Sequence, residues 1–215
     1  MPPKPIFTKE EIVEAALGIV SRAGIEALTA KELGQALGSS ARPIFTVFSG
    51  MKEVQDAVRA AAMRRFESFA GQMTPDMPFF KQIGMKMVLF GVREPKLYRL
   101  LFMQKNRDAV GFGDVFGGLG PIAERCITEI RAEYGLSAAE ADLLFENVWI
   151  YTFGVGALCA TQACRFPERQ LSRMLTTEFQ AIMLLIRSGG AAALPPAQTE
   201  YAERKNRSAH DNGGL

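Results

Sequence analysis

Hydrophobic residues recur at helical spacing along most of this chain. After Thr8, apolar side chains at i, i+3, i+4 and i+7 predict a helix that ends at Gly24; they are Val13, Ala16, Leu17 and Val20. Similar patterns predict helices at about 51–72, 79–93, 95–103, 121–134, 137–164 and 167–188. Alternation typical of strands does not occur over a useful length, so the pattern predicts an all-α fold.

The segment 29–48 predicts two short helices joined by a tight turn. Thr29 and Glu32 have the spacing of a capping box, in which a hydroxyl and a carboxylate satisfy the first N–H groups of a helix. Gly38 is expected to end this helix, because glycine readily adopts the left-handed backbone of a C-terminal cap. Together with the helix that follows Thr8, the segment would complete a three-helix module.

The second short helix is expected to begin at Ser40, a residue type that often caps the first N–H groups. Pro43 is tolerated in a first helical turn, because its missing N–H would have no helical partner there. Ile44 and Phe48 would face inward. This order is typical of modules that place the second helix in the major groove of DNA, although it also fits a purely structural helical hairpin.

We expect three regions along the chain. Residues 1–50 would form a helix-turn-helix DNA-binding domain, and residues 51–188 a larger helical domain for ligand binding and dimerisation, with 51–72 as the connecting helix. Residues 189–215 contain few large apolar side chains and are expected to be a flexible tail.

Composition indicates a globular protein but does not by itself indicate DNA binding. Hydrophobic residues occupy 48% of the 215 positions, enough for a substantial core. The formal net charge is only +2, and residues 1–60 contain seven basic and seven acidic residues, so contact with DNA must depend on where charges lie. Three cysteines without a paired spacing, and no secretory signal, predict reduced thiols in a cytoplasmic protein.

The segment 147–164 has no charged residue over its 18 positions, which is the lower limit for a membrane-spanning helix. It includes polar side chains and lacks a flanking basic cluster, so we favour a buried or interfacial helix and expect no membrane association. Gly156, Ala160 and Cys164 recur at i+4 spacing, which suits close packing against another helix, including the same helix of a partner chain.

No catalytic residue is predicted. The only histidine, His210, lies in the expected tail, which argues against a histidine-based triad or a histidine-rich metal site. Gly111–Phe116 shares part of a dinucleotide-binding fingerprint, but no strand precedes it and phenylalanine occupies its last position, so a plain loop is expected. We therefore expect no enzyme, no metal and no cofactor.

Large or soft apolar side chains are frequent between residues 85 and 153. Most such side chains are core residues, although methionine and aromatic surfaces also form adaptable pockets for apolar ligands. The candidate pocket residues are Met87, Phe90, Phe102, Met103, Phe116, Trp149 and Phe153. The pattern leaves open which of them line a pocket and which fill the core.

Residues 8–56 resemble the DNA-binding domain of the tetracycline-repressor (TetR) family. The similarity comprises TKEEIVEAALGIVSRAGIEALTAKELGQALG, then Ser40, Pro43-Ile44-Phe45, Phe48 and Lys52-Glu53-Val54, while EPKLYRLLF at 94–102 is similar to a segment of that family's second domain. The resemblance implies a bacterial, homodimeric transcriptional repressor. Its second domain would bind a small apolar inducer, and its last two long helices would form a four-helix dimer interface.

The resemblance also implies which residues face DNA. Thr29 and Lys31 match positions that often touch phosphate, and Lys52 lies beside a position where the family usually has lysine. The turn and the exposed face of the recognition helix would contribute Ser40, Ala41, Arg42, Phe45 and Thr46.

Three positions depart from the family's pattern. The family often has tyrosine where this chain has Phe45, often histidine at Val47, and usually lysine at Met51. Each departure removes a possible phosphate contact. Arg42 is then the best single candidate for reading a base, since its guanidinium can pair bidentately with guanine.

Two other functions are compatible with these residues. One is a helical small-molecule sensor whose N-terminal module contacts protein instead of DNA; ligand binding without any DNA site would favour it. The other is an enzyme that uses the apolar pocket; loss of turnover on mutation of a pocket carboxylate such as Glu146 would favour it.

Overall fold

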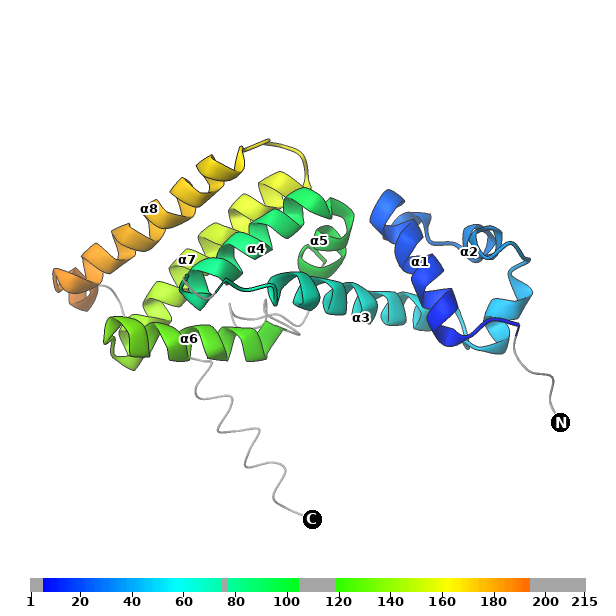
Figure 1. The fold of residues 1–215 in the computed structure, drawn as a ribbon, viewed down its shortest axis with the longest axis horizontal. Helices are drawn as coiled ribbons and strands as arrows, with labels where there is room; N and C mark the ends of the chain where they lie inside the picture. The colour runs from blue at the N-terminus through cyan, green and yellow to red at the C-terminus, as the bar shows by residue number, and fades with distance from the viewer. Residues whose placement is uncertain (1–5, 75–76, 105–118, 194–215) are drawn as a thin grey trace, which may run out of the picture. The chain divides into compact units, whose positions relative to one another are not determined.

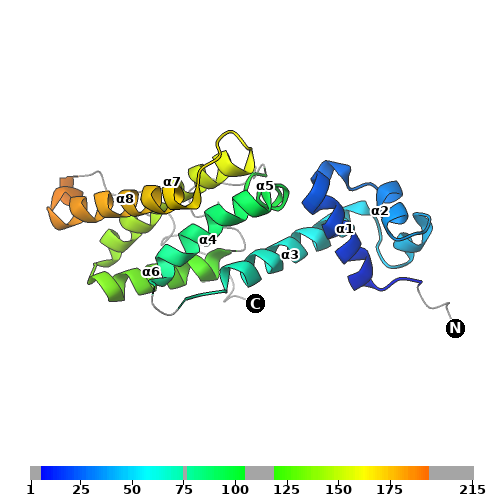
Figure 2. The same ribbon diagram turned by 45° about the horizontal axis from the view of Figure 1, so that its top comes forward.

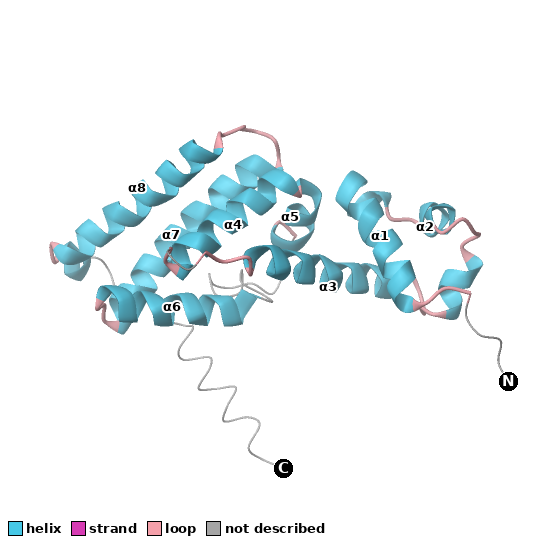
Figure 3. Ribbon diagram, in the orientation of Figure 1, coloured by secondary structure: helices cyan, strands magenta, loops and turns pink. Residues whose placement is uncertain are grey.

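A computed structural model of the chain describes residues 6–74, 77–104 and 119–193. Over these residues the secondary structure consists of helices and loops, without a strand (Figures 1 and 3), which confirms the predicted all-α fold. The α-helices are α1 (Lys9–Ala23), α2 (Ala30–Ala36), α3 (Met51–Ala70), α4 (Phe79–Arg93), α5 (Pro95–Phe102), α6 (Gly120–Tyr134), α7 (Ala138–Ala160) and α8 (Glu168–Arg187). The 3-10 helices are η1 (Ile25–Ala27), η2 (Arg42–Thr46) and η5 (Gly190–Ala193).

Two capping boxes form completely. Before α1, Thr8 N–H donates to Glu11 Oε2 at 2.7 Å, and Glu11 N–H donates to Thr8 Oγ1 at 3.1 Å. Before α7, Ser137 N–H and Glu140 N–H make the same pair of bonds, at 2.8 and 3.3 Å. Local sequence alone therefore determines where these two helices begin.

The capping box expected at Thr29 and Glu32 is only half formed. Glu32 N–H donates to Thr29 Oγ1 at 3.1 Å, but Thr29 N–H donates to Ala27 O at 3.0 Å. The prediction of a reciprocal bond was wrong, because η1 brings a backbone carbonyl to the donor that Glu32 was expected to satisfy.

The chain divides into two compact units. Unit 1 comprises Met1–Pro75, Lys86–Gln104 and Phe153–Pro167, and unit 2 comprises Asp76–Met85, Lys105–Thr152 and Glu168–Leu215. Helices α4 and α7 each contribute residues to both units. Within unit 1, α1 and α3 pack on α5, so the N-terminal module shares a unit with part of the later chain. The functional boundaries expected at residues 50 and 188 stay a prediction.

Aromatic side chains fill the interior of unit 1. Phe66 is fully buried, and its ring lies edge-to-face on Phe90, with centroids 5.2 Å apart, and on Phe102, at 5.3 Å. Tyr98 is also fully buried, and its hydroxyl donates to Phe153 O at 3.2 Å. Burial raises the pKa of Tyr98, so this hydroxyl remains a donor at neutral pH.

Glu94, directly before α5, joins three helices of unit 1. Its carboxylate accepts a hydrogen bond from Ser21 Oγ of α1 at 2.8 Å and pairs with Arg65 of α3. Arg59 of α3 adds a bond from its guanidinium to Leu100 O at 2.8 Å. These polar contacts tie the N-terminal module to α5.

Unit 2 is built from α6, α8 and the first parts of α4 and α7. Helices α7 and α8 run in opposite directions (Figures 1 and 2). α7 ends at Ala160 and not near Cys164 as expected, because Gln162 has φ 60° and Cys164 N–H turns back to Leu158 O at 3.3 Å. Cys126 and Cys159 are buried, Cys164 is half-buried, and all three thiols are free, as predicted.

By length and composition, α7 is apolar enough to cross a membrane. Its most apolar window has a mean hydropathy of 1.4, and half of that window is buried inside the protein. A helix that is hydrophobic on all sides is usually buried on all sides. α7 departs from this rule, because Asn147, Ile150, Gly154 and Leu158 are exposed.

Candidate nucleic-acid interface

A small closed core holds the N-terminal module together. α1 packs against α2 and α3, and α2 packs against η2. Side chains from each of these elements are at most 1% exposed; they are Ile12, Ala16, Val20, Leu33, Ile44, Phe48 and Val54. The inward placement of Ile44 and Phe48 is thus confirmed, and it fixes which face of η2 remains outside.

Gly34 allows α2 and the following turn to approach closely. A Cβ atom at Gly34 would lie 2.8 Å from the carbonyl carbon of Ser40 and 2.9 Å from the nitrogen of Ala41. Gly34 O also accepts from Ser39 N–H at 2.8 Å. Gly38, with φ 66°, follows the end of α2, as predicted. Sequence reasoning missed Gly34, although a glycine inside a helical pattern is a sign of close packing.

The second helix of the module is the 3-10 helix η2. Its N-cap is Ala41 and no side chain caps it, so the capping role expected of Ser40 was wrong. Five residues that include Pro43 offer few N–H groups for bonds to the fourth preceding carbonyl, and 3-10 geometry is common in such short pieces. Phe48 N–H donates to Ile44 O at 3.0 Å, which anchors the end of η2 beside its buried residues.

The residues expected to face DNA lie on the outside of this module. Ala41 is half-buried, and the others are exposed; they are Thr29, Lys31, Ser40, Arg42, Phe45, Thr46 and Lys52. Phe45 is 46% exposed, on the same short helix as the fully buried Ile44. The structure therefore gathers these side chains on α2, the turn, η2 and the first turn of α3.

The hydroxyl groups of Thr29 and Thr46 differ in whether they can still donate a hydrogen bond. Thr29 Oγ1 accepts from Glu32 N–H, so the hydroxyl hydrogen can donate to a phosphate oxygen. Thr46 Oγ1 already donates to Pro43 O at 2.6 Å, which leaves it mainly an acceptor. Thr29 is the better phosphate donor.

The three cations of this surface also differ. Lys52 lies 3.2 Å from Asp56 on the exposed side of α3. Lys31 and Arg42 form no ion pair with any residue in the described part of the chain. Arg42 is therefore available to an anionic or acceptor-rich partner without first breaking a salt bridge.

Glu53, an acidic residue beside this surface, is hydrogen-bonded and ion-paired within the module. Its carboxylate accepts from Ser49 N–H at 2.8 Å and from Ser49 Oγ at 2.9 Å, and it lies 3.5 Å from Lys9. The bond from the Ser49 backbone is the main cause that lowers the pKa of Glu53. Glu53 therefore stays ionised, and its pairing with Lys9 engages one base together with one acid, so the balance of charges in the module is unchanged.

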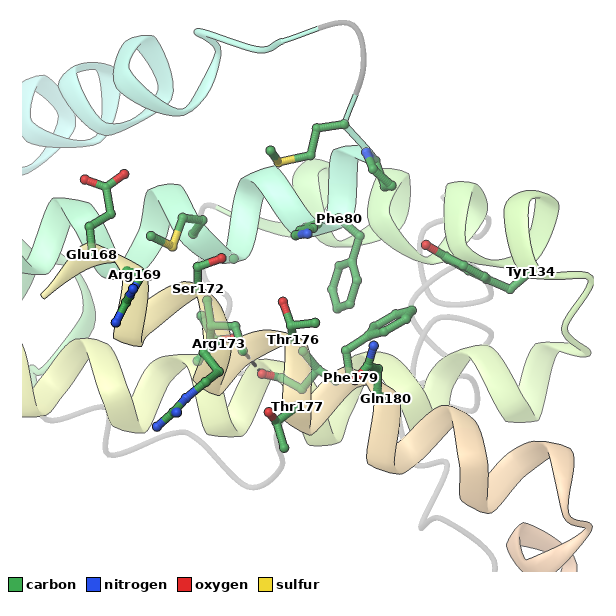
Figure 4. A pocket seen from close by; sticks show the side chains of 18 residues that line it. Phe80, Tyr134, Glu168, Arg169, Ser172, Arg173, Thr176, Thr177, Phe179 and Gln180 are labelled. Carbon is green, nitrogen blue, oxygen red and sulfur yellow. Dashed lines mark hydrogen bonds between the residues drawn. The ribbon is translucent and has the colours of Figure 1, made fainter. Parts of the chain in front are cut away.

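A cavity of about 1000 Å³ lies in unit 2, between α8 and parts of α4, α6 and α7 (Figure 4). Its size is at the upper end for small-molecule sites. Phe80 of α4 and Phe179 of α8 lie beside one another in it, with ring centroids 6.3 Å apart. Arg169, Ser172 and Arg173 of α8 contribute polar lining.

Seven apolar residues were expected at a ligand site, and none of the six that the structure describes lines this cavity. Met87, Phe90 and Trp149 are at most 1% exposed, and Phe102 and Phe153 pack on Tyr98 in unit 1 at 5.0 and 6.2 Å. Met103 is 37% exposed, and Phe116 lies outside the described residues. A ligand-binding role for these seven stays a prediction.

The described residues contain no group of three or more metal-ligating side chains.

No protein-family model and no curated protein matches the chain.

Solved structures do match the fold. A protein from Vibrio parahaemolyticus, assigned to the TetR family of transcriptional regulators, is 15% identical with a TM-score of 0.54, over 80% of this chain and 96% of that one. Another protein assigned to that family, from Mesorhizobium loti, is also 15% identical, with a TM-score of 0.56 over 82% of this chain and 95% of its own. The chain therefore has the fold of TetR-type regulators, as the resemblance of residues 8–56 predicted.

Proposed function

We propose that this protein is a TetR-like DNA-binding transcriptional regulator that acts as a cytoplasmic homodimer. The observation that carries the proposal is the division of η2 into two faces. Ile44 is fully buried with Phe48 behind it, while Arg42 is exposed without an ion pair among the described residues and Phe45 is 46% exposed. A purely structural hairpin would gain nothing from an exposed phenylalanine beside an unpaired arginine.

Each exposed side chain has a role suited to its chemistry. Arg42 would read guanine in the major groove through two parallel hydrogen bonds, and Phe45 would contact the methyl group of thymine. Side-chain contacts to phosphate would come from Thr29, Lys31, Ser40 and Lys52. Ala41 would contribute only its backbone N–H, and Thr46 Oγ1, as an acceptor, would meet a donor on a base edge. Two such modules in a dimer would enter successive major grooves roughly 34–36 Å apart.

The proposed dimer interface would cover the exposed residues of α7. An uncharged stripe runs along α7 at alternating spacings of four and three residues, through Leu143, Asn147, Ile150, Gly154 and Ala157. A second such stripe runs along α8 through Gln170, Met174, Thr177, Ala181 and Leu184. Ile150 is 55% exposed and Leu184 is 70% exposed. Two antiparallel helices with stripes of this kind are suited to a four-helix bundle with a second copy.

A small molecule in the cavity of unit 2 would regulate DNA binding. α4 and α7 line the cavity with Gly84, Met85 and Thr152, and both helices then continue into unit 1. A ligand that favours a dimer geometry in which the two modules no longer match successive grooves would release the DNA by population shift. The protein would therefore act as a repressor that its ligand relieves.

Fluorescence anisotropy of the full-length protein with DNA from upstream of its own gene tests the proposal. We expect sequence-preferring binding that weakens with salt, and an Arg42→Ala variant that binds about 1–3 kcal/mol more weakly. Arg22→Ala, which changes an exposed arginine of α1 outside the candidate set, is the control and should bind as the wild type does. Absence of sequence preference with and without ligand would refute the proposal.

Sedimentation of a Leu184→Glu variant tests the dimer separately. A carboxylate buried in an apolar helix–helix interface is strongly unfavourable, so we expect monomers and much weaker DNA binding. Val92→Glu, at another exposed apolar residue that lies outside both stripes, should remain a dimer. A dimeric Leu184→Glu protein would place the interface elsewhere.

A further inference from the structure

The cavity of unit 2 carries a surplus of positive charge. Its lining includes Lys81 of α4 and Arg169 and Arg173 of α8, against the one carboxylate of Glu168 among the lining residues. None of these cations forms an ion pair with a residue that the structure describes. An anionic group that enters the cavity would meet three cationic side chains not already paired there.

Hydrogen-bond donors accompany these cations on α8. Ser172, Thr176 and Gln180 line the cavity at successive spacings of four residues, so they follow one another along one face of the helix (Figure 4). Arg169 and Arg173 have the same spacing and lie beside them. A ladder of hydroxyl, amide and guanidinium groups is suited to the oxygens of an anionic headgroup.

The rest of the lining is apolar. The ring of Phe179 lies 6.3 Å from that of Phe80 and 5.3 Å from that of Tyr134, and Val148 and Leu175 add aliphatic surface. Burial, with a smaller contribution from Glu133, raises the pKa of Tyr134 to about 12, so its hydroxyl stays neutral. The cavity thus joins an apolar region to a cationic one.

We infer that this cavity binds an amphipathic anion, an apolar molecule with one carboxylate held by Arg169, Arg173 and Lys81. The apolar body would lie against Phe80 and Phe179. A regulatory role for this ligand rests on the proposed function. The sequence predicted an apolar ligand, and the cavity indicates one that also carries a negative charge. Lys81, Arg169 and Arg173 are exposed, so they stay hydrated beside an uncharged ligand, which would gain no charge-assisted bond from them. Arginine, by contrast, pairs with a carboxylate through two parallel bonds.

Isothermal titration calorimetry of the full-length protein with decanoate, 1-decanol and decylamine tests the inference. We expect decanoate to bind with an affinity that falls as salt is added, and the two other probes to bind at least roughly tenfold more weakly. In the double variant Arg169→Gln/Arg173→Gln, decanoate should bind roughly tenfold or more weakly, because bonds to charged groups are lost, while binding of decanol should not change.

Arg187→Gln is the matched control, because this arginine lies on α8 but does not line the cavity. It should bind decanoate as the wild type does. Lys81→Gln provides a second variant on another helix, so that misfolding of the double variant cannot hide the effect. Circular dichroism and sedimentation should show that each variant remains a folded dimer.

Equal binding of decanoate and decanol, or unchanged decanoate binding in both cavity variants, would overturn the inference. Binding of decyl phosphate but not of decanoate would overturn the carboxylate assignment. Anisotropy on the same samples separates the two proposals: DNA binding without decanoate binding contradicts only the ligand, and decanoate binding without DNA binding contradicts only the regulatory function.

Discussion

Unit 1 has a tightly packed aromatic interior, whereas unit 2 contains an open cavity. In unit 1, rings pack edge-to-face around Phe66, and Gly91 lets α4 approach α7 so closely that a Cβ atom there would lie 2.9 Å from Gly156 O. In unit 2, a cavity of about 1000 Å³ is lined by guanidinium groups, hydroxyls and two phenylalanine rings. Rings thus fill the interior of unit 1, whereas the neighbouring rings of Phe80, Phe179 and Tyr134 in unit 2 border open space beside polar residues of α8.

The largest expected effect is a difference between two phenylalanine truncations. Phe66→Ala should lower the free energy of unfolding by about 3–5 kcal/mol, because Phe66 is fully buried between two rings. Phe179→Ala should cost only about 1–2 kcal/mol, because this half-buried side chain borders space that is already open. Urea unfolding at one fixed protein concentration measures both, and equal losses would remove the contrast between the units.

Alanine substitutions at two glycines of α4 should change stability by smaller amounts but in opposite directions. Gly91→Ala should destabilise unit 1 by about 1–3 kcal/mol, because backbone oxygen of α7 blocks the added methyl group. Gly84→Ala in unit 2 should stabilise by about 0.5–1 kcal/mol, because the nearest neighbour, Thr152, would lie 3.7 Å away and alanine favours the helix. Thermal unfolding of the two variants measures the signs, and a destabilising Gly84→Ala would show that the cavity wall is less open than described.

The smallest effect concerns two surface carboxylates, one in each unit. A side-chain hydrogen bond from Ser137 is the main cause that lowers the pKa of Glu140, and the backbone of Ser49 does the same for Glu53. Because both pKa values lie below the usual 4.5 in the folded state, the carboxylates stabilise the protein above about pH 4.5, and this contribution is lost as the pH falls through the lowered values.

Unfolding measured between pH 6 and 3 tests this point. Glu140→Gln and Glu53→Gln should each show a shallower loss of stability on acidification than the wild type, by similar amounts, since the difference between the units lies in their interiors. Curves parallel to that of the wild type would mean that these hydrogen bonds do not persist in solution.

The sequence predicted features that depend on local chemistry. Helical periodicity located the long helices within a few residues. The capping boxes at Thr8 and Ser137 are equally local, because their bonds join residues three apart. The inward placement of Ile44 and Phe48 followed from spacing alone.

Features that depend on distant contacts were not predicted. The role of Gly34 appears only when the turn at Ser40 is seen against it, and the 3-10 geometry of η2 follows from that constraint together with Pro43. The cavity was not predicted, because the helical spacing of Arg169, Ser172 and Thr176 also fits a solvent-facing surface; only packing shows that α4 and α7 form the opposite wall. The aromatic residues that line the cavity, Phe80, Tyr134 and Phe179, were not among the seven candidates.

Selection of bound DNA from a random library by the full-length protein tests the central claim most directly. We expect a near-palindromic sequence whose half-sites lie about 10–10.5 base pairs apart, or a multiple of that, and an Arg42→Ala variant that loses preference at one guanine in each half-site while retaining the others. Enrichment of no sequence, or an unchanged preference in Arg42→Ala, would contradict the assignment of η2 as the DNA-reading element.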